Sequence, residues 1–173
     1  MYRAPKIIIC LTCWHIGLLI AYLIDFDITE FTKNKVSIYN SKSFIEIFYY
    51  ILKSNSIVGL LCCYLGYLSG GLITLIILIF NGYLFGIYFF PFLKLSTLDF
   101  QHNQPLINLF GHVPFEIISF SLFGALGLRG FDWLIKLYSD KGIEIDLPSP
   151  EALLIPFLIL VFATIIETYA IYH

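Results

Sequence analysis

Among the ionisable residues inside otherwise apolar stretches of the chain, three could act together: His112, Glu116 and Glu167. An imidazole and two carboxylates can exchange a proton, hold a divalent metal ion or pair with a cationic partner, so these residue types leave several chemistries open. His112 and Glu116 are four residues apart, which places them on one face of a helix. Inside a membrane an ionisable group is unfavourable unless it is paired or hydrated, so each of the three is a candidate functional residue.

Purely structural roles compete with these chemistries. Pro114 fits the first turn of a helix, so Glu116 would lie in that turn, where the helix dipole and free amides favour a carboxylate. His112 would then cap the helix or reach the lipid headgroups. A zinc site of His112, Glu116 and Glu167 would leave one position for water, but no second histidine stands four residues from His112 to complete a metalloprotease helix. We predict no metal ion and no other cofactor.

Three further polar residues extend the candidate cluster: Asn55 and Lys53, where the second apolar segment begins, and Asn81, midway along the third. An amide inside a span more often bonds to a neighbouring helix than to a ligand. Because successive spans alternate in direction, the second and fourth begin on the side where the fifth ends. We therefore expect the ionisable groups to gather in one half of the bilayer, as a site for a partner, a proton or an ion.

The composition indicates that the bilayer is the solvent of this chain. Of its 173 residues 59% are hydrophobic and only 13% are charged, with a mean hydropathy of +0.86, whereas soluble domains carry about 25% charged residues. Its apolar runs approach the roughly 17–25 residues that cross a hydrocarbon core. A net charge of −2 and the lack of any run of Lys or Arg give no sign of nucleic acid as a partner.

The apolar segments predict an all-α, polytopic integral membrane helix bundle that forms a single domain over residues 1–173. Segments at residues 43–54 and 130–138 carry apolar side chains at helical spacing and predict short interfacial helices. The apolar piece at residues 106–110, ahead of Gly111 and Pro114, indicates a broken or re-entrant segment. The five predicted spans are residues 7–24, 56–68, 72–90, 113–128 and 152–172.

Small residues recur at three- and four-residue spacing in the second, third and fourth spans. Glycine at such positions lets helix backbones approach closely, so we expect these three spans to pack tightly. The four cysteines all fall in apolar segments, where a thiol behaves as a small hydrophobic group, and no disulfide or redox site is predicted. The glycines assigned to helix packing are Gly66, Gly70, Gly82, Gly86, Gly124 and Gly127.

Three segments resemble the stage II sporulation protein M family of bacterial and archaeal membrane proteins. GYLSGGLITLIILIFNGYLFG, residues 66–86, is similar to the glycine-rich hairpin of that family, which ends in Asn-Gly with a further glycine four residues on. GHVPFEIISFSLFGALGLRG, residues 111–130, resembles its His-Gly-x-x-Glu stretch, although Val113 stands where the family usually has glycine. ATIIETYA, with Glu167, resembles the carboxylate of its last span.

The resemblance implies a five-span protein linked to envelope remodelling. The sporulation member of the family works with peptidoglycan-degrading partners during engulfment, and relatives accompany circular bacteriocin gene sets. We therefore expect a non-enzymatic component of a multiprotein envelope complex in a prokaryotic cytoplasmic membrane, bound to other membrane or envelope proteins or to copies of itself. The alternative is a transporter or export subunit, in which His112, Glu116 and Glu167 line a polar pathway.

Overall fold

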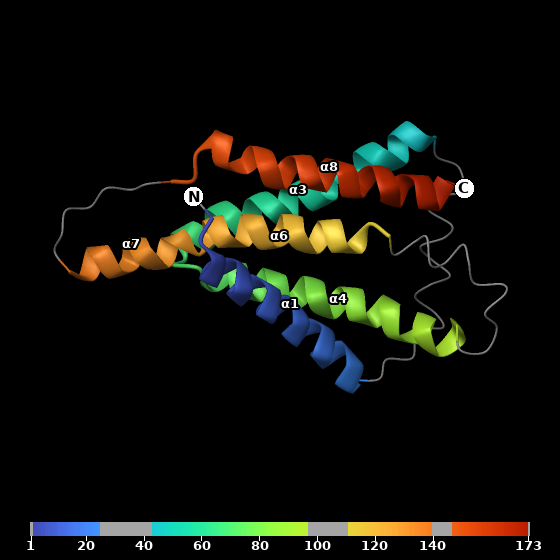
Figure 1. Ribbon diagram of the computed structural model, residues 1–173, viewed down its shortest axis with the longest axis horizontal. Helices are drawn as coiled ribbons and strands as arrows, with labels where there is room; N and C mark the ends of the chain where they lie inside the picture. Colours follow the sequence, from blue (N-terminus) through green and yellow to red (C-terminus); the bar gives the residue numbers. More distant parts are fainter. Residues whose placement is uncertain (1, 25–42, 97–110, 140–146, 173) are drawn as a thin grey trace.

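The computed structural model describes residues 2–24, 43–96, 111–139 and 147–172, and every regular element in these ranges is an α-helix. Figure 1 shows the long helices running side by side as a bundle, from which a short helix, α7 (Arg129–Tyr138), projects at one end. The all-α prediction is therefore confirmed. The helices are α1 (Ala4–Ile24), α3 (Phe44–Leu68), α4 (Leu72–Ser96), α6 (Val113–Gly127), α7 (Arg129–Tyr138) and α8 (Pro150–Tyr172).

Five helical segments are long and apolar enough to cross a membrane. Their outward-facing side chains are mostly large and hydrophobic, which suits a surface in contact with lipid. The prediction of five spans is thus confirmed by length and composition. The segments are Ala4–Ile24, Phe44–Leu68, Leu72–Phe90, Val113–Tyr138, which combines α6 with α7, and Pro150–Tyr172.

The second span differs from its predicted form. The sequence indicated an interfacial helix at residues 43–54 and a separate span at 56–68, whereas α3 is one continuous helix of 25 residues. The polar run from Lys53 to Ser56 suggested the interruption, but it contains no glycine or proline, and Asn55 within it donates a hydrogen bond to the side chain of Glu116. A polar residue that is bonded inside the bundle does not need to mark the end of a span.

One other boundary differs from prediction, and one predicted short helix is found in its expected place. The backbone of α4 stays helical past Pro91 as far as Ser96, because a proline removes one backbone hydrogen bond without forcing a helix to end there. The predicted interfacial helix at residues 130–138 is α7, which continues roughly in the direction of α6 beyond the bundle (Figure 1). Only Leu128 separates the two helices. The broken segment predicted at residues 106–110 lies outside the described residues.

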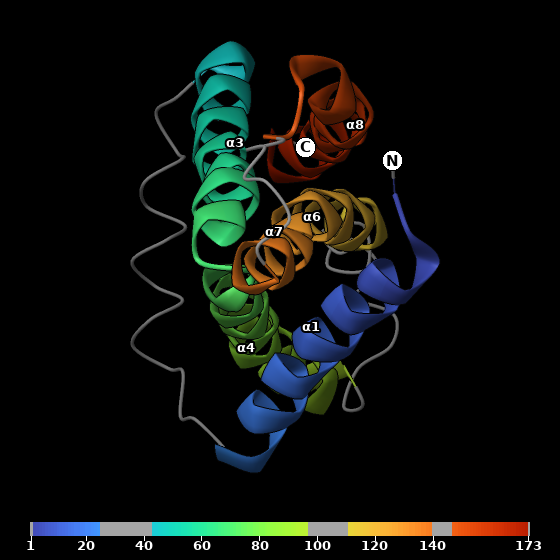
Figure 2. The same cartoon turned by 90° about the vertical axis from the view of Figure 1, so that its left-hand side faces the viewer.

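Helix α6 is the centre of the bundle. Figure 2 shows it surrounded by α1, α3, α4 and α8. Its residues from Ser119 to Gly127 are nearly all buried, and Phe123 and Leu126 are 1% and 0% exposed. Helix α8 contributes a buried stripe at helical spacing, which includes Pro156, Leu160 and Thr164. Side chains at the beginning of α6 and near the end of α8 are therefore held against each other.

The two ends of the bundle differ in character. At one end, which we call the turn end, lie the N-terminus, the turn between α3 and α4, helix α7 and the start of α8 (Figure 1). Gly70 and Gly71 form that turn with φ of 65° and 94°, a conformation that favours glycine. At the other end, which we call the cluster end, lie the starts of α3 and α6 and the end of α8. His112 and Glu116, at the start of α6, and Glu167, near the end of α8, therefore lie toward the cluster end.

A close backbone contact joins α1 to α4. A Cβ atom added at Gly17 would lie 1.9 Å from the carbonyl oxygen of Ile79, and one added at Gly82 would lie 2.0 Å from that of Trp14. Gly86 lies one turn further along and packs on the side chain of Ala21. The backbones of these two helices therefore touch, a contact for which the sequence analysis considered only the α4 side.

A second close contact brings α3, α4 and α6 together near the turn end. The hydroxyl of Thr74 donates to the carbonyl of Cys62 at 2.8 Å, and added Cβ atoms at Gly66 and Gly127 would both collide with that hydroxyl. On α6, Gly124 lies against Cys10 and Leu78. Of the glycines assigned to packing, Gly70 is the exception, because it lies in the turn between helices.

Candidate functional site

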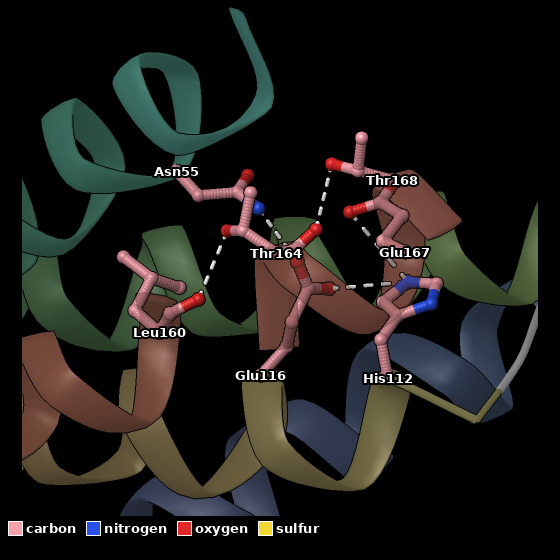
Figure 3. Close-up of polar contacts among 7 residues, drawn as sticks. All are labelled: Asn55, His112, Glu116, Leu160, Thr164, Glu167 and Thr168. Carbon is pink, nitrogen blue, oxygen red and sulfur yellow. Dashed lines mark hydrogen bonds and ion pairs between the residues drawn. The ribbon is translucent and has the colours of Figure 1, made fainter. Parts of the chain in front are cut away.

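The structure brings His112, Glu116 and Glu167 together at the cluster end. Nε2 of His112 lies 3.8 Å from a carboxylate oxygen of Glu116 and 3.9 Å from one of Glu167. Figure 3 shows the imidazole beside both carboxylates, with His112 and Glu116 projecting from α6 and Glu167 from α8. These separations exceed hydrogen-bond length, so the attraction is that of an ion pair and requires a protonated imidazole.

The start of α6 fixes the first two members of the cluster. His112 is the N-cap residue, Pro114 occupies the first turn, and the amide of Glu116 donates to the carbonyl of His112 at 3.2 Å. The side chain of His112 makes no capping hydrogen bond, so the capping role considered from sequence is not the one it takes. Glu116 lies in the first turn as expected, where the helix dipole favours a carboxylate.

Asn55 of α3 is the fourth member of the cluster. Its Nδ2 donates to Oε1 of Glu116 at 2.6 Å, across 61 residues of sequence. This bond fixes one oxygen of Glu116, while Oε2 is the oxygen that approaches His112. Three helices, α3, α6 and α8, thus contribute to the cluster, and Asn55 orients the carboxylate of α6.

The cluster is enclosed without being sealed. The side chain of His112 is 10% exposed, and those of Glu116 and Glu167 are 21% and 22% exposed. The carboxylates therefore lie at the margin of the bundle, within reach of an ion, of water or of a polar group on another protein. Two neighbouring carboxylates repel each other, so this arrangement favours a proton, a cation or a cationic partner between them.

Thr164 and Thr168 line α8 beside the cluster, and sequence analysis did not single them out. Both are fully buried, and each hydroxyl donates to the carbonyl four residues earlier in its own helix, at 2.9 and 2.7 Å. Figure 3 shows these bonds beside Glu167. The available signal was the spacing of four residues between the two threonines, which is typical of one face of a helix.

Two residues assigned to the cluster from sequence lie elsewhere. Asn81 is half-buried, and its Nδ2 donates to the carbonyl of Ile77 in its own helix at 2.8 Å. Lys53 lies on the exposed side of α3. The polar cluster is therefore His112, Glu116, Glu167 and Asn55, and we use the name in that sense below.

A separate set of polar contacts closes the turn end. Pro156 lies inside α8. A proline has no backbone N–H, so the carbonyl four residues earlier lacks its usual helical hydrogen bond. That carbonyl belongs to Ala152, and it accepts a hydrogen bond of 2.5 Å from the hydroxyl of Tyr2. Burial raises the pKa of the Tyr2 hydroxyl above its ordinary value, which keeps it protonated as a donor.

Lys6 forms the other contact at this end. Its ammonium lies 2.7 Å from a carboxylate oxygen of Asp132 on α7 and 3.0 Å from the carbonyl of Leu128. The side chain of Lys6 is 13% exposed, whereas Arg3, which lies 3.9 Å from the same carboxylate, is 75% exposed. Lys6 thus ties the start of α1 to the junction of α6 with α7.

Within the described ranges, His112, Glu116 and Glu167 form a group that could hold a metal ion, because one ligand atom from each lies within 4.8 Å of the others. The four cysteines are buried in the apolar interior with free thiols. The same oxygen and nitrogen atoms could instead pass a proton between carboxylate and imidazole. The arrangement thus suits the binding of a cation or a proton in one half of the bundle.

Comparison with known proteins identifies the family of the chain. The family model described as Stage II sporulation protein M matches residues 7–170, a range that covers all five spans and the whole polar cluster. No curated protein and no solved structure matched the chain. This multi-pass membrane protein belongs to the stage II sporulation protein M family.

Proposed function

We propose that this protein is a non-enzymatic integral membrane component of a multiprotein envelope or membrane-remodelling complex. The observation that carries the proposal is its architecture. Five membrane-spanning segments account for most of the described chain and pack around α6, and the chain belongs to a family named for a sporulation protein. A chain of this design contributes a surface within the bilayer on which other proteins assemble.

The lengths of the connections support a non-enzymatic role. The segments between spans lie at residues 25–43, 69–71, 91–112 and 139–149, and each is well below the roughly 40 residues at which a soluble domain begins to build its own core. Any hydrolysis of the cell wall would thus be carried out by partners with soluble domains. We place the complex in a prokaryotic cytoplasmic membrane, with other membrane or envelope proteins as partners.

Reciprocal purification tests this proposal. The tagged chain, expressed from its own locus, is solubilised in mild detergent, and bound proteins are quantified by mass spectrometry. We expect one or two envelope proteins at a ratio near one to one, and we expect a tag on each of them to recover this chain. Glu151→Gln, which changes an exposed carboxylate at the turn end, serves as a control that should keep the complex. Recovery of the chain alone from both directions would refute the proposal.

A second candidate function is transport, and the polar cluster is the observation that favours it. Ionisable groups within a bundle of membrane-spanning helices are typical of proton and ion pathways. For this function we expect proton flux when the protein is reconstituted into vesicles that contain a pH-sensitive dye. Glu116→Gln and Glu167→Gln should abolish the flux, whereas under the leading proposal both variants keep the complex and the wild-type protein gives no flux above that of empty vesicles.

A further inference from the structure

We propose that His112, Glu116 and Glu167 bind a divalent transition-metal ion of the zinc type, which links α6 to α8 at the cluster end of the bundle. The ligands are Nε2 of His112 and one oxygen from each carboxylate. This proposal goes beyond the function proposed above and is independent of it, because a structural ion can serve a scaffold or a transporter equally. The sequence analysis considered these three ligands and predicted no metal ion; the structure brings them together from two helices that lie far apart in the chain.

The geometry is close to that of a metal site. The three ligand atoms lie within 4.8 Å of one another, so a point can be found no more than about 2.8 Å (4.8/√3) from each of them. Zinc bonds to imidazole nitrogen and carboxylate oxygen are about 2.0–2.2 Å long. Each ligand atom thus needs to move inward by roughly 0.7 Å or less to meet an ion, and rotation about side-chain bonds supplies a shift of that size.

Charge gives the reason for a divalent ion. Two ionised carboxylates beside a neutral imidazole carry two negative charges, and a single protonated imidazole would offset only one of them. An uncompensated charge is unfavourable within a membrane. A divalent cation bound to two carboxylates and a neutral imidazole makes the site neutral overall, and it satisfies all three side chains with one ligand.

Asn55 provides the support that a metal ligand requires. Metal-bound carboxylates and imidazoles are oriented by hydrogen bonds from a surrounding layer of residues. Nδ2 of Asn55 donates to Oε1 of Glu116, and Oε2 is the atom turned to Nε2 of His112. The second carboxylate enters from α8, which packs along α6 through Pro156, whose carbonyl accepts a hydrogen bond from Ser119 at 2.8 Å. The ligands are thus held on packed helices, and the three of them leave a coordination position for water.

The experiment uses the full chain in detergent, first stripped with a chelator and then titrated with Zn²⁺ alone. We expect one Zn²⁺ per chain by elemental analysis and a rise in the unfolding temperature on addition of Zn²⁺. X-ray absorption of the zinc-loaded protein should show only nitrogen and oxygen neighbours, at about 2.0–2.2 Å. This last measurement needs no variant, and it separates the proposed site from the buried cysteines, since sulfur neighbours would lie at about 2.3 Å.

Matched variants test the individual ligands. His112→Gln and Glu167→Gln should each weaken Zn²⁺ binding by about 100-fold or more, since loss of supporting residues alone weakens metal sites by about 10–100-fold. His15→Gln and Glu151→Gln change a histidine and a glutamate that are exposed elsewhere on the bundle, and both should bind Zn²⁺ as the wild type does. Sulfur neighbours in the absorption spectrum, failure of the wild type to hold one Zn²⁺, or unchanged binding in His112→Gln would each overturn the proposal.

Discussion

The contact between α1 and α4 gives the most precisely defined prediction. In Gly82→Ala the new Cβ atom would lie 2.0 Å from the carbonyl oxygen of Trp14 and 2.9 Å from its carbonyl carbon. Side-chain carbons in proteins keep at least 3.0 Å from such atoms, so the two helices must separate by about 1.0 Å (3.0 − 2.0) at this point. Because both contacted atoms are backbone, rotation of a side chain cannot relieve the clash.

The expected loss of stability follows from two opposing effects. Alanine is favoured over glycine inside a helix by about 0.5–1 kcal/mol, whereas overpacking of a close contact costs about 1–3 kcal/mol. The overpacking term is larger, so Gly82→Ala should lower the free energy of unfolding by roughly 1–2 kcal/mol, a substantial part of the roughly 5–15 kcal/mol that a protein has. We would measure it by SDS-induced or thermal unfolding in a fixed detergent.

Two further variants make the test specific. Gly59→Ala is a matched control inside α3, where the new Cβ would lie 2.7 Å from a side-chain atom of Phe123. A shift of the ring can relieve part of this clash, so the variant should lose less stability than Gly82→Ala. Gly17→Ala acts on the same crossing, with its Cβ 1.9 Å from the carbonyl oxygen of Ile79. Once one substitution has separated the helices, the other meets a weaker clash. The loss of unfolding free energy in the double variant Gly17→Ala, Gly82→Ala should therefore be smaller than the sum of the losses in the two single variants. A Gly82→Ala protein as stable as the wild type, or strict additivity with Gly17→Ala, would refute the close approach.

Three other predictions concern polar contacts, all measured by unfolding in detergent. Tyr2→Phe removes the hydroxyl that donates to the carbonyl of Ala152 and should lower the free energy of unfolding by about 1 kcal/mol. In a Pro156→Ala background the backbone amide of residue 156 can donate to that carbonyl, so the same change should lower it by almost nothing. An equal loss in both backgrounds would contradict the contact. Lys6→Met should destabilise the protein more than Arg3→Met, because the ion pair of Arg3 with Asp132 is longer and more exposed and contributes about 0–1 kcal/mol. A larger loss in Arg3→Met would contradict the role of Lys6 in holding α7. With chelator present, Asn55→Leu removes the amide donor from the carboxylate on α6 and should cost about 0.6–1.7 kcal/mol, and an unchanged stability would argue against that bond.

The sequence was sufficient to predict the helical class and the number of spans, because both depend on local hydropathy. Segments such as α1 and α8 carry long apolar runs whose lengths match the thickness of a bilayer. The prediction of a break in the second span was wrong because hydropathy treats Lys53 to Ser56 as a return to water. Only the fold shows that Asn55 is bonded to a residue 61 positions away.

The polar cluster could be predicted in part. The alternation of spans was enough to expect His112, Glu116 and Glu167 on one side, and the structure brings the three together. The same reasoning added Asn81 and Lys53, because position along a span says nothing about the direction in which a side chain points around the helix. Asn81 bonds within its own helix instead.

The packing of α1 was not predicted, and the reason is similar. Gly82 and Gly86 were assigned to helix packing, but Gly17, their counterpart on α1, stands alone in its segment without a repeat of small residues. A single glycine shows its role only when the partner backbone is in place. The contact between Tyr2 and the carbonyl of Ala152 joins residues 150 positions apart, so no local pattern could have indicated it.

The most direct test of the proposed role is native mass spectrometry of the tagged chain ejected from its own membrane without prior purification of any partner. If the protein is a component of an envelope complex, the spectrum should contain an assembly whose mass is that of the 19.9 kDa chain plus at least one different protein, and that assembly should dissociate to release both. A spectrum that contains only whole multiples of the 19.9 kDa chain would contradict the account and would favour transport by a homo-oligomer.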